Sequence, residues 1–183
     1  MAPLIGNKRN VKIFVLYLMQ NINYPLDYVT INDIVMQNDY VLYLDFAESF
    51  NEMLDADLIE DCGKNDAGDS MYVVTDKGRL VATTLQSEIL TSLLDKSLEC
   101  ALRYIDFKKR NVKASARVEK RSDGRYDVVC ALQENGDSIM ENRVVVDTLN
   151  RAERMADNFR DHPEGVFKGV MALLSGNINF IFN

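Results

Sequence analysis

The sequence predicts an α+β protein in two parts, and three observations support this fold class. Apolar residues recur at three- and four-residue steps in several segments, which is the helical period. Asp-Gly at 123–124 and Asn-Gly at 135–136 separate β-favouring runs, as hairpin turns do. A chain of 183 residues, 47% of them hydrophobic, can bury one sizeable core or two small ones. We therefore expect two domains, residues 1–86 and 87–183.

The first part begins with three helical patterns. Residues 8–22 are apolar on nearly every side, which predicts a helix central to a core. The second pattern begins at Thr30, a favourable N-cap residue. The third begins at Asp45, with Glu48 at the N3 position of a capping arrangement, and predicts a helix over residues 46–55.

A hairpin and a fourth helix follow. Residues 58–74 predict two strands around an exposed polar loop from Gly63 to Ser70. The second strand leads into "YVVTDKG", residues 72–78, where Thr75 can cap a helix and Asp76 suits the positive end of its dipole. The predicted order is therefore helix, helix, helix, strand, loop, strand and helix.

This order resembles the winged helix-turn-helix of bacterial transcriptional regulators of the PadR and MarR groups. In those proteins a wing strand of the form Tyr-x-x-Thr-x-Lys-Gly often leads into the next helix, as Tyr72, Thr75, Lys77 and Gly78 do here. With "NDY" at 38–40 and the C-terminal half, the whole chain resembles an uncharacterised Gram-positive bacterial family of similar length. The resemblance implies a winged-helix transcriptional regulator that binds duplex DNA as a homodimer.

In such proteins the third helix and the wing face the DNA. The resemblance therefore gives these candidate DNA-binding residues: Ala47, Glu48, Ser49, Asn51, Glu52, Lys64 and Asn65.

The charge pattern disfavours this use of the third helix. From Ile13 to Gly63 the chain has ten acidic residues and no lysine or arginine, although cations normally supply much of the affinity for DNA. Capping explains Glu48, whereas Glu52 and Asp55 have no such role. A second interpretation therefore stays open, in which the acidic third helix binds a protein partner and no DNA is bound.

The second part begins with a long helix, predicted over residues 87–108. Its apolar residues occupy more than one narrow stripe, which is more than packing on one side requires. Closed twofold dimers are the commonest oligomers, so we expect a homodimer through this helix. The candidate interface residues are Leu90, Leu94, Ala101 and Ile105. By analogy, the second part is an effector or dimerisation module.

Two turn signals then predict a three-stranded antiparallel meander. Its strands are expected at 112–121, 125–134 and 138–146. Two-residue turns would set the register and give these cross-strand pairs: Val118 with Val129, and Leu132 with Ile139. Closing helices are expected from about Thr148 and from about Pro163, a residue suited to a first helical turn.

Basic residues collect between Arg103 and Arg125, where nine bases accompany three acids. The favoured interpretation is a helix C-terminus followed by a solvated hairpin. The alternative is a patch for an acidic partner, such as the acidic third helix of a neighbouring protomer.

No pattern in the sequence indicates catalysis, a metal or a cofactor. His162 stands alone beside Pro163, and no histidine cluster accompanies the three scattered cysteines, Cys62, Cys100 and Cys130. Cysteines of this kind are typical of a reducing compartment, so we expect a cytoplasmic protein. The net charge of −7 and the short apolar segments give no reason to expect membrane binding.

Overall fold

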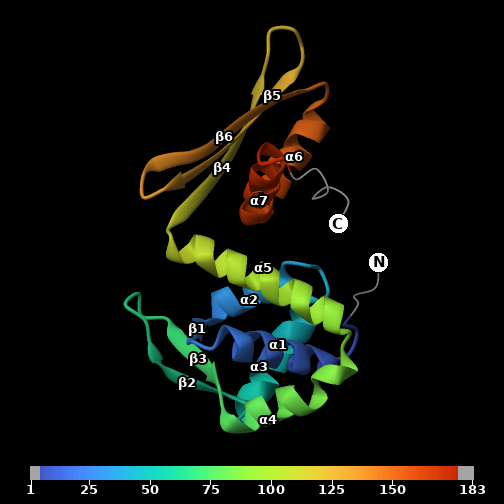
Figure 1. Ribbon diagram of the computed structural model, residues 1–183, viewed down its shortest axis with the longest axis vertical. Helices are drawn as coiled ribbons and strands as arrows, with labels where there is room; N and C mark the ends of the chain where they lie inside the picture. The colour runs from blue at the N-terminus through green and yellow to red at the C-terminus, as the bar shows by residue number, and fades with distance from the viewer. Residues whose placement is uncertain (1–4, 177–183) are drawn as a thin grey trace. The chain divides into compact units, whose positions relative to one another are not determined.

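The computed structural model describes residues 5–176, and within them the chain is α+β, as the sequence predicts. It holds seven α-helices and two three-stranded antiparallel sheets (Figure 1). The elements are, in chain order, α1 Lys8–Ile22, β1 Leu26–Asp27, α2 Tyr28–Met36, α3 Tyr43–Asp55, β2 Ile59–Lys64, β3 Ser70–Val74, α4 Asp76–Leu85, the 3-10 turn η1 Gln86–Glu88, α5 Thr91–Lys109, β4 Val112–Lys120, β5 Tyr126–Glu134, β6 Asp137–Val146, α6 Leu149–Asp161 and α7 Pro163–Leu174.

The chain divides into two compact units between Leu102 and Arg103, inside α5. The sequence-based boundary at 86/87 lies earlier, between α4 and α5. The first half of α5 belongs to the N-terminal unit, where the Asp95 carboxylate hydrogen-bonds the Tyr17 side chain of α1. Burial and this carboxylate together raise the pKa of Tyr17.

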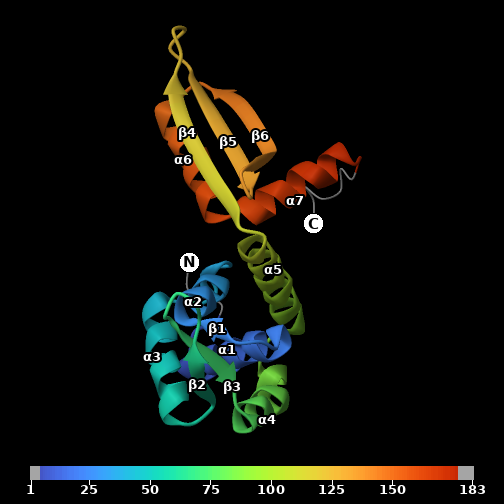
Figure 2. The same ribbon diagram turned by 90° about the vertical axis from the view of Figure 1, so that its left-hand side faces the viewer.

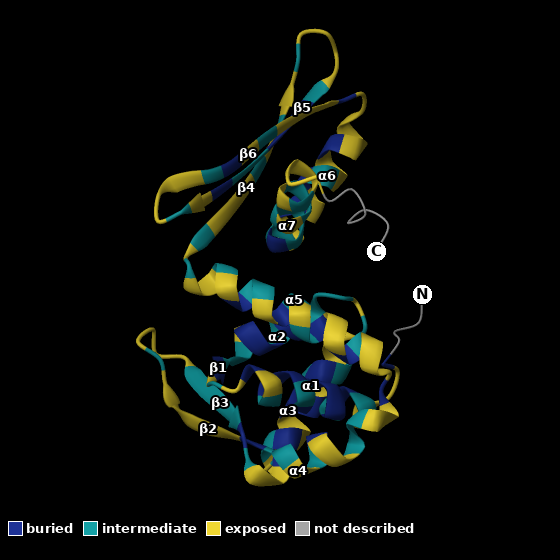
Figure 3. Cartoon of the chain, viewed as in Figure 1, coloured by how far each residue is buried: buried dark blue, intermediate teal, exposed yellow. Residues whose placement is uncertain are grey.

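The core of the N-terminal unit forms around α1, as its all-round apolar sequence predicts. Most of its side chains are buried, whereas β2 is exposed along nearly its whole length (Figure 3). Four aromatic rings join α2, α3 and β3, with centroids 4.9 to 5.9 Å apart. They belong to Tyr28, Phe46, Phe50 and Tyr72. This aromatic cluster fixes the buried side of α3.

Three helix starts differ from the predictions. The long helix predicted from residue 87 begins only at Thr91, because residues 86–88 form the 3-10 turn η1. The second helix begins at Tyr28, because the Asp27 carboxylate accepts hydrogen bonds from the backbone N–H and hydroxyl of Thr30, at 2.8 and 2.6 Å. Thr30 is therefore inside the helix and is not its cap. The third helix begins at Tyr43, two residues before Asp45, and its N-cap makes no side-chain hydrogen bond.

In the first sheet the strand order is β1-β3-β2, and β2 and β3 form the expected hairpin. The short strand β1 pairs with β3 and was not predicted. The turn of the hairpin covers residues 65–69, within the loop that the sequence predicts.

The C-terminal unit contains the predicted meander, with strand order β4-β5-β6. One face of this sheet packs against α6 and α7, and Figure 2 shows the three strands side by side. Val128 and Leu132 of β5 point to this face and contact Ala156 and Phe159 of α6 respectively. The opposite face carries the alternate residues, among them Asp127.

The predicted strand register is wrong by one residue in both hairpins. Between β4 and β5 the loop covers residues 121–125 and is longer than a two-residue turn, so Val118 lies opposite Val128. Between β5 and β6 the two-residue turn is present, but a bulge after Leu132 places that residue opposite Met140.

The two closing helices begin where the sequence predicts. Thr148 caps α6 by accepting a hydrogen bond from the Arg151 backbone N–H, and Pro163 occupies the first turn of α7. Among the helices of residues 5–176, none combines the length and the apolar character needed to cross a bilayer.

Candidate functional site

The "YVVTDKG" segment anchors α4 to the connection between α3 and β2. The Thr75 hydroxyl accepts a hydrogen bond from the Gly78 N–H at 3.1 Å and donates one to the Asp57 carbonyl at 2.7 Å. A Cβ on Gly78 would overlap the backbone carbonyl of Leu58 and lie 2.8 Å from Val74 Cγ1. Thr75 and Gly78 therefore hold the base of the hairpin in place.

Two basic side chains of this region, Lys77 and Arg79, also make hydrogen bonds within the fold. Lys77 Nζ donates to the Ala56 carbonyl at 2.7 Å, and Arg79 donates to the Asn23 side chain at 3.3 Å. Both contacts hold the ends of neighbouring helices.

The residues of α3 that were predicted to contact DNA differ in their exposure to solvent. Ser49 is 0% exposed, so it cannot reach any partner. Ala47 is half-buried, and Glu48, Asn51 and Glu52 are exposed. The outer face of α3 therefore offers a partner one amide and two carboxylates from the predicted set.

The two carboxylates are paired with lysines of α1. Lys8 Nζ contacts Glu48 Oε2, and Lys12 Nζ lies 2.8 Å from Glu52 Oε2. The hydrogen bond from Lys12 lowers the pKa of Glu52, and that to Glu48 raises the pKa of Lys8. Glu52 thus has a structural role that its sequence position did not indicate. Lys8 and Lys12 are correspondingly engaged with carboxylates beside α3.

An exposed apolar patch lies at the start of α2 and α3, and the sequence analysis missed it. It consists of Val29, Leu42, Tyr43 and Leu44, with exposures from 55 to 72%. Tyr43 hydrogen-bonds the Tyr28 side chain, which places the two helix starts side by side. The signal in the sequence was "VLYLD" at 41–45, where an apolar run continues past the last residue needed for the core.

The β2–β3 hairpin, predicted to be a wing, presents one of its two predicted DNA-binding residues. The Asn65 side chain accepts hydrogen bonds from the backbone N–H groups of Ala67 and Asp69, both at 2.9 Å, so it shapes the turn. Lys64 is exposed at the end of β2. Nearby, the Gly63 N–H donates to the Asp61 carboxylate and lowers its pKa.

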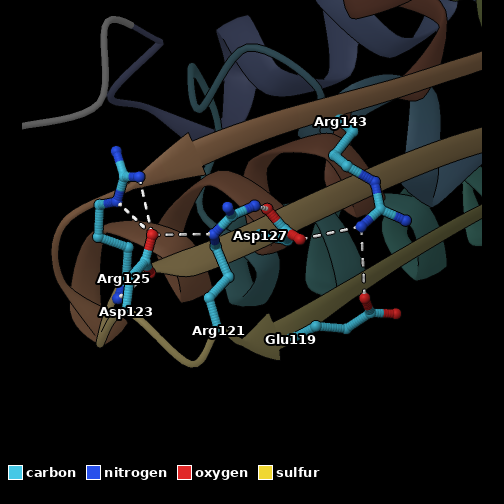
Figure 4. A network of polar contacts seen from close by, with 6 residues as sticks. All are labelled: Glu119, Arg121, Asp123, Arg125, Asp127 and Arg143. Atoms are coloured by element: carbon cyan, nitrogen blue, oxygen red, sulfur yellow. Dashed lines mark hydrogen bonds and ion pairs between the residues drawn. The ribbon is translucent and has the colours of Figure 1, made fainter.

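The basic segment between Arg103 and Arg125 is largely neutralised within the C-terminal unit. Figure 4 shows Asp127 between two arginines, Arg121 at 3.1 Å and Arg143 at 2.9 Å. These arginines lower the pKa of Asp127 although its burial alone would raise it. Arg125 bonds Asp123 at 2.8 Å and lowers the pKa of that carboxyl to about 2.

Two further bases of this segment are paired in the same way. Arg117 lies 2.7 Å from Glu119, and Arg110 lies 2.8 Å from Glu134. These pairs agree with the favoured interpretation of a solvated hairpin. They also reduce the number of cations available for the alternative, a patch that binds an acidic partner.

The residues predicted for a dimer interface are mostly buried within the single chain. Leu94, Ala101 and Ile105 are among the core residues, so a second chain cannot contact them while α5 is packed. Leu90 is 75% exposed and remains available. The several apolar stripes of α5 are explained in large part by packing within the chain.

The cysteines and His162 give no constellation for chemistry. Cys62, Cys100 and Cys130 form no disulfide, and Cys62 is exposed on β2. His162 lies between α6 and α7, beside Pro163, as expected. Within residues 5–176 no three histidine, cysteine or acidic side chains are grouped as metal ligands.

Comparison with known families matches residues 11–174 to one described as a domain of unknown function, DUF4364. No match was found among curated proteins or among solved structures.

Proposed function

The chain belongs to the DUF4364 family, and we propose that it is a cytoplasmic, non-enzymatic regulatory protein whose N-terminal winged helix binds another protein through the outer face of α3. Its three free thiols fit a reducing compartment. The family match extends over both units of the chain.

One observation carries this proposal: the exposed apolar patch lies at the start of α3, a helix that carries Asp45 and Asp55 in addition to the lysine-paired Glu48 and Glu52. Leu44 is the most exposed member of the patch, and Glu48 lies one helical turn further along α3. Exposed apolar residues that adjoin polar ones are typical of protein-interaction sites. The pairing of Lys8 and Lys12 with carboxylates removes the cations that a phosphate backbone would require.

The chemistry of this face defines the partner. An apolar segment would cover Leu42, Tyr43 and Leu44, and basic residues beside it would meet Asp45 and Asp55 of α3. We therefore expect a protein segment that combines aliphatic or aromatic side chains with lysine or arginine.

Duplex DNA is the second candidate, and the order of elements together with Lys64 on the wing favours it. Because few cations are available near α3, generic duplex binding should be weak. We expect log affinity to fall with log salt at a slope shallower than about −5, since each neutralised phosphate contributes about −0.9.

Two measurements on the full chain separate these candidates. Peptide display against the wild-type chain should enrich peptides that combine apolar and basic residues. These peptides should not bind the Leu44→Lys variant but should still bind the Leu80→Lys variant. Leu80 is a matched control because it is 68% exposed on α4. Fluorescence anisotropy with random duplex DNA across a salt series tests the second candidate.

The outcomes are distinct. Peptides that bind Leu44→Lys as well as the wild type would refute the α3 face as the contact surface. A steep salt slope with sub-micromolar generic affinity would instead favour DNA binding.

We also propose that the protein is a homodimer. Since Leu94, Ala101 and Ile105 are buried, the interface would use exposed residues such as Leu90, which immediately precedes α5, and Leu102 within it. Analytical ultracentrifugation should show a dimer that Leu90→Glu weakens. A wild-type monomer at every concentration would contradict this expectation.

A further inference from the structure

An apolar hollow opens in the C-terminal unit on the sheet face that α6 and α7 cover. Its volume is about 350 Å³, which lies within the range of small-molecule sites. Val128 and Cys130 of β5 and Asn142 and Val144 of β6 line it from the sheet, and α6 and α7 supply the rest.

This hollow exists because α6 lies toward one side of the sheet. Arg160 on one flank of α6 donates to the Ala116 carbonyl of β4 at 2.7 Å. The other flank, which includes Met155, therefore faces β6, where Val144 is 45% exposed. The inner face of β6 is thus incompletely covered by the helix.

A second hollow of about 560 Å³ adjoins the first along this flank. Met155 and Asn158 line both hollows, so the two share a wall. Arg151 and Arg154 also line the second one, and they stand four residues before Met155 and Asn158 respectively, so they lie on the same side of α6. The apolar hollow and the second hollow, whose lining includes Arg151 and Arg154, therefore meet at Met155 and Asn158 of α6.

Among the described residues that line these two hollows, the charged ones are the arginines Arg151 and Arg154. Arg151 makes one long contact, 3.5 Å to Asp147, with both side chains highly exposed. Asp157 of the same helix is engaged with Arg160, which lies on the flank toward β4. Burial raises the pKa of Cys130, so this thiol adds no negative charge to the apolar hollow.

We propose that the two hollows form one binding site for a small molecule with an apolar body and a carboxylate group. The apolar body fills the space above Val128 and Val144, and the carboxylate binds Arg151 and Arg154. The asparagine amides of Asn142 and Asn158 supply hydrogen bonds between these two regions. Arginine is suited to this role because its planar fork binds a carboxylate through two hydrogen bonds.

This site lies entirely within the C-terminal unit and does not depend on the function proposed for α3. A ligand there would give the protein an effector input. Failure of the α3 proposal would leave this site unaffected, and the reverse also holds.

Isothermal titration calorimetry on the full chain tests the proposal with octanoate and 2-naphthoate as probes and octanamide as the neutral analogue of octanoate. Both carboxylates should bind saturably, and octanamide should bind about tenfold more weakly, since a charge-assisted hydrogen bond contributes roughly this much. Arg154→Ala should weaken the carboxylates about tenfold and leave octanamide unchanged. Val144→Trp should remove binding of all three by filling the apolar hollow.

Arg117→Ala is the matched control. It removes one arginine from the opposite face of the same sheet, so probe binding should be unchanged. Circular dichroism should confirm that each variant is folded. Should Val144→Trp fail to fold, the comparison of Arg154→Ala with Arg117→Ala decides the question.

Three results would overturn the proposal. The first is no saturable binding of either carboxylate. The second is equal affinity for octanoate and octanamide, or an unchanged affinity in Arg154→Ala. The third is binding only after removal of residues 177–183, which would identify that apolar segment of the chain as the occupant.

Discussion

Ion pairs have different roles in the two units. In the N-terminal unit, Lys8 and Lys12 pair with α3 carboxylates on a surface where every partner is substantially exposed. In the C-terminal unit, Asp127 is only 8% exposed and is held between two arginines. Exposed pairs contribute little to stability but decide which charges a surface offers, whereas a nearly buried carboxylate depends on its partners.

The units also differ in how much space surrounds a glycine in the first turn of a helix. In the N-terminal unit the start of α4 is pressed against the Leu58 carbonyl, and only glycine fits at position 78. In the C-terminal unit Gly165 of α7 has open space around its Cα and ordinary helical backbone angles. Substitutions at the two glycines should therefore have opposite effects.

Gly78→Ala should have the largest effect. The added methyl group must displace the backbone of Leu58, so we expect the free energy of unfolding to fall by about 3 kcal/mol or more. The control Gly165→Ala should raise it by about 0.5–1 kcal/mol, because alanine favours the helix. Chemical denaturation measures both values. Equal effects of the two substitutions would show that the contact at Gly78 is not tight.

The two threonine caps should differ less strongly. Thr75→Ala removes a cap hydrogen bond and the bond to the Asp57 carbonyl, so a loss of about 1–2 kcal/mol is expected. Thr148→Ala removes a single long bond of 3.4 Å, so about 0.5 kcal/mol is expected. The same denaturation experiment compares them, and a larger loss for Thr148→Ala would contradict the comparison.

One ion-paired carboxylate in each unit, Glu52 and Asp123, should have a pKa below its ordinary range. The folded pKa of Asp123 is about 2, against about 3.9 when unfolded, so its stabilising contribution is present above pH 4 and is lost as the pH falls toward 2. Arg125→Gln should raise this pKa toward 3.9, and Lys12→Gln should raise that of Glu52 toward 4.3. NMR titration of the carboxyl carbons tests both, and an unshifted pKa in either variant would refute that pairing.

The smallest effect should appear in DNA binding. Replacing both Glu48 and Glu52 with glutamine releases Lys8 and Lys12, so the salt slope with random duplex should steepen by about 1.8 per protomer. Glu119→Gln, in the C-terminal unit, is the control and should leave the slope unchanged. Anisotropy measures both slopes. A steeper slope for Glu119→Gln alone would move the DNA-binding surface to the C-terminal unit.

Local signals in the sequence predicted most elements but not their register. The Thr148 cap, the Pro163 helix start and the Asn-Gly turn at 135–136 depend on a few adjacent residues, and all three are confirmed. The loop at 121–125 is longer than the predicted two-residue turn because the Asp123 carboxylate accepts hydrogen bonds from the side chain and the backbone N–H of Arg125. A bulge such as the one after Leu132 leaves no mark in an alternating pattern.

The candidate site was harder to predict than the fold. The α1–α3 ion pairs join residues forty positions apart, so only the folded structure reveals that Glu52 is neutralised. The apolar stripes of α5 could not be divided between a dimer interface and the core, because periodicity gives the direction of a face but not what covers it. Ser49 and Asn65 have suitable side chains but are buried or engaged in a turn.

The exposed thiol of Cys62 on β2 allows selective labelling of the β2–β3 hairpin. Cys100 and Cys130 are partly buried, and the raised pKa of Cys130 slows its reaction with a maleimide further. A fluorophore would therefore attach first to Cys62, on the hairpin whose tip carries Lys64. Brief labelling of the native chain would place a spectroscopic reporter on the β2–β3 hairpin without any engineered cysteine.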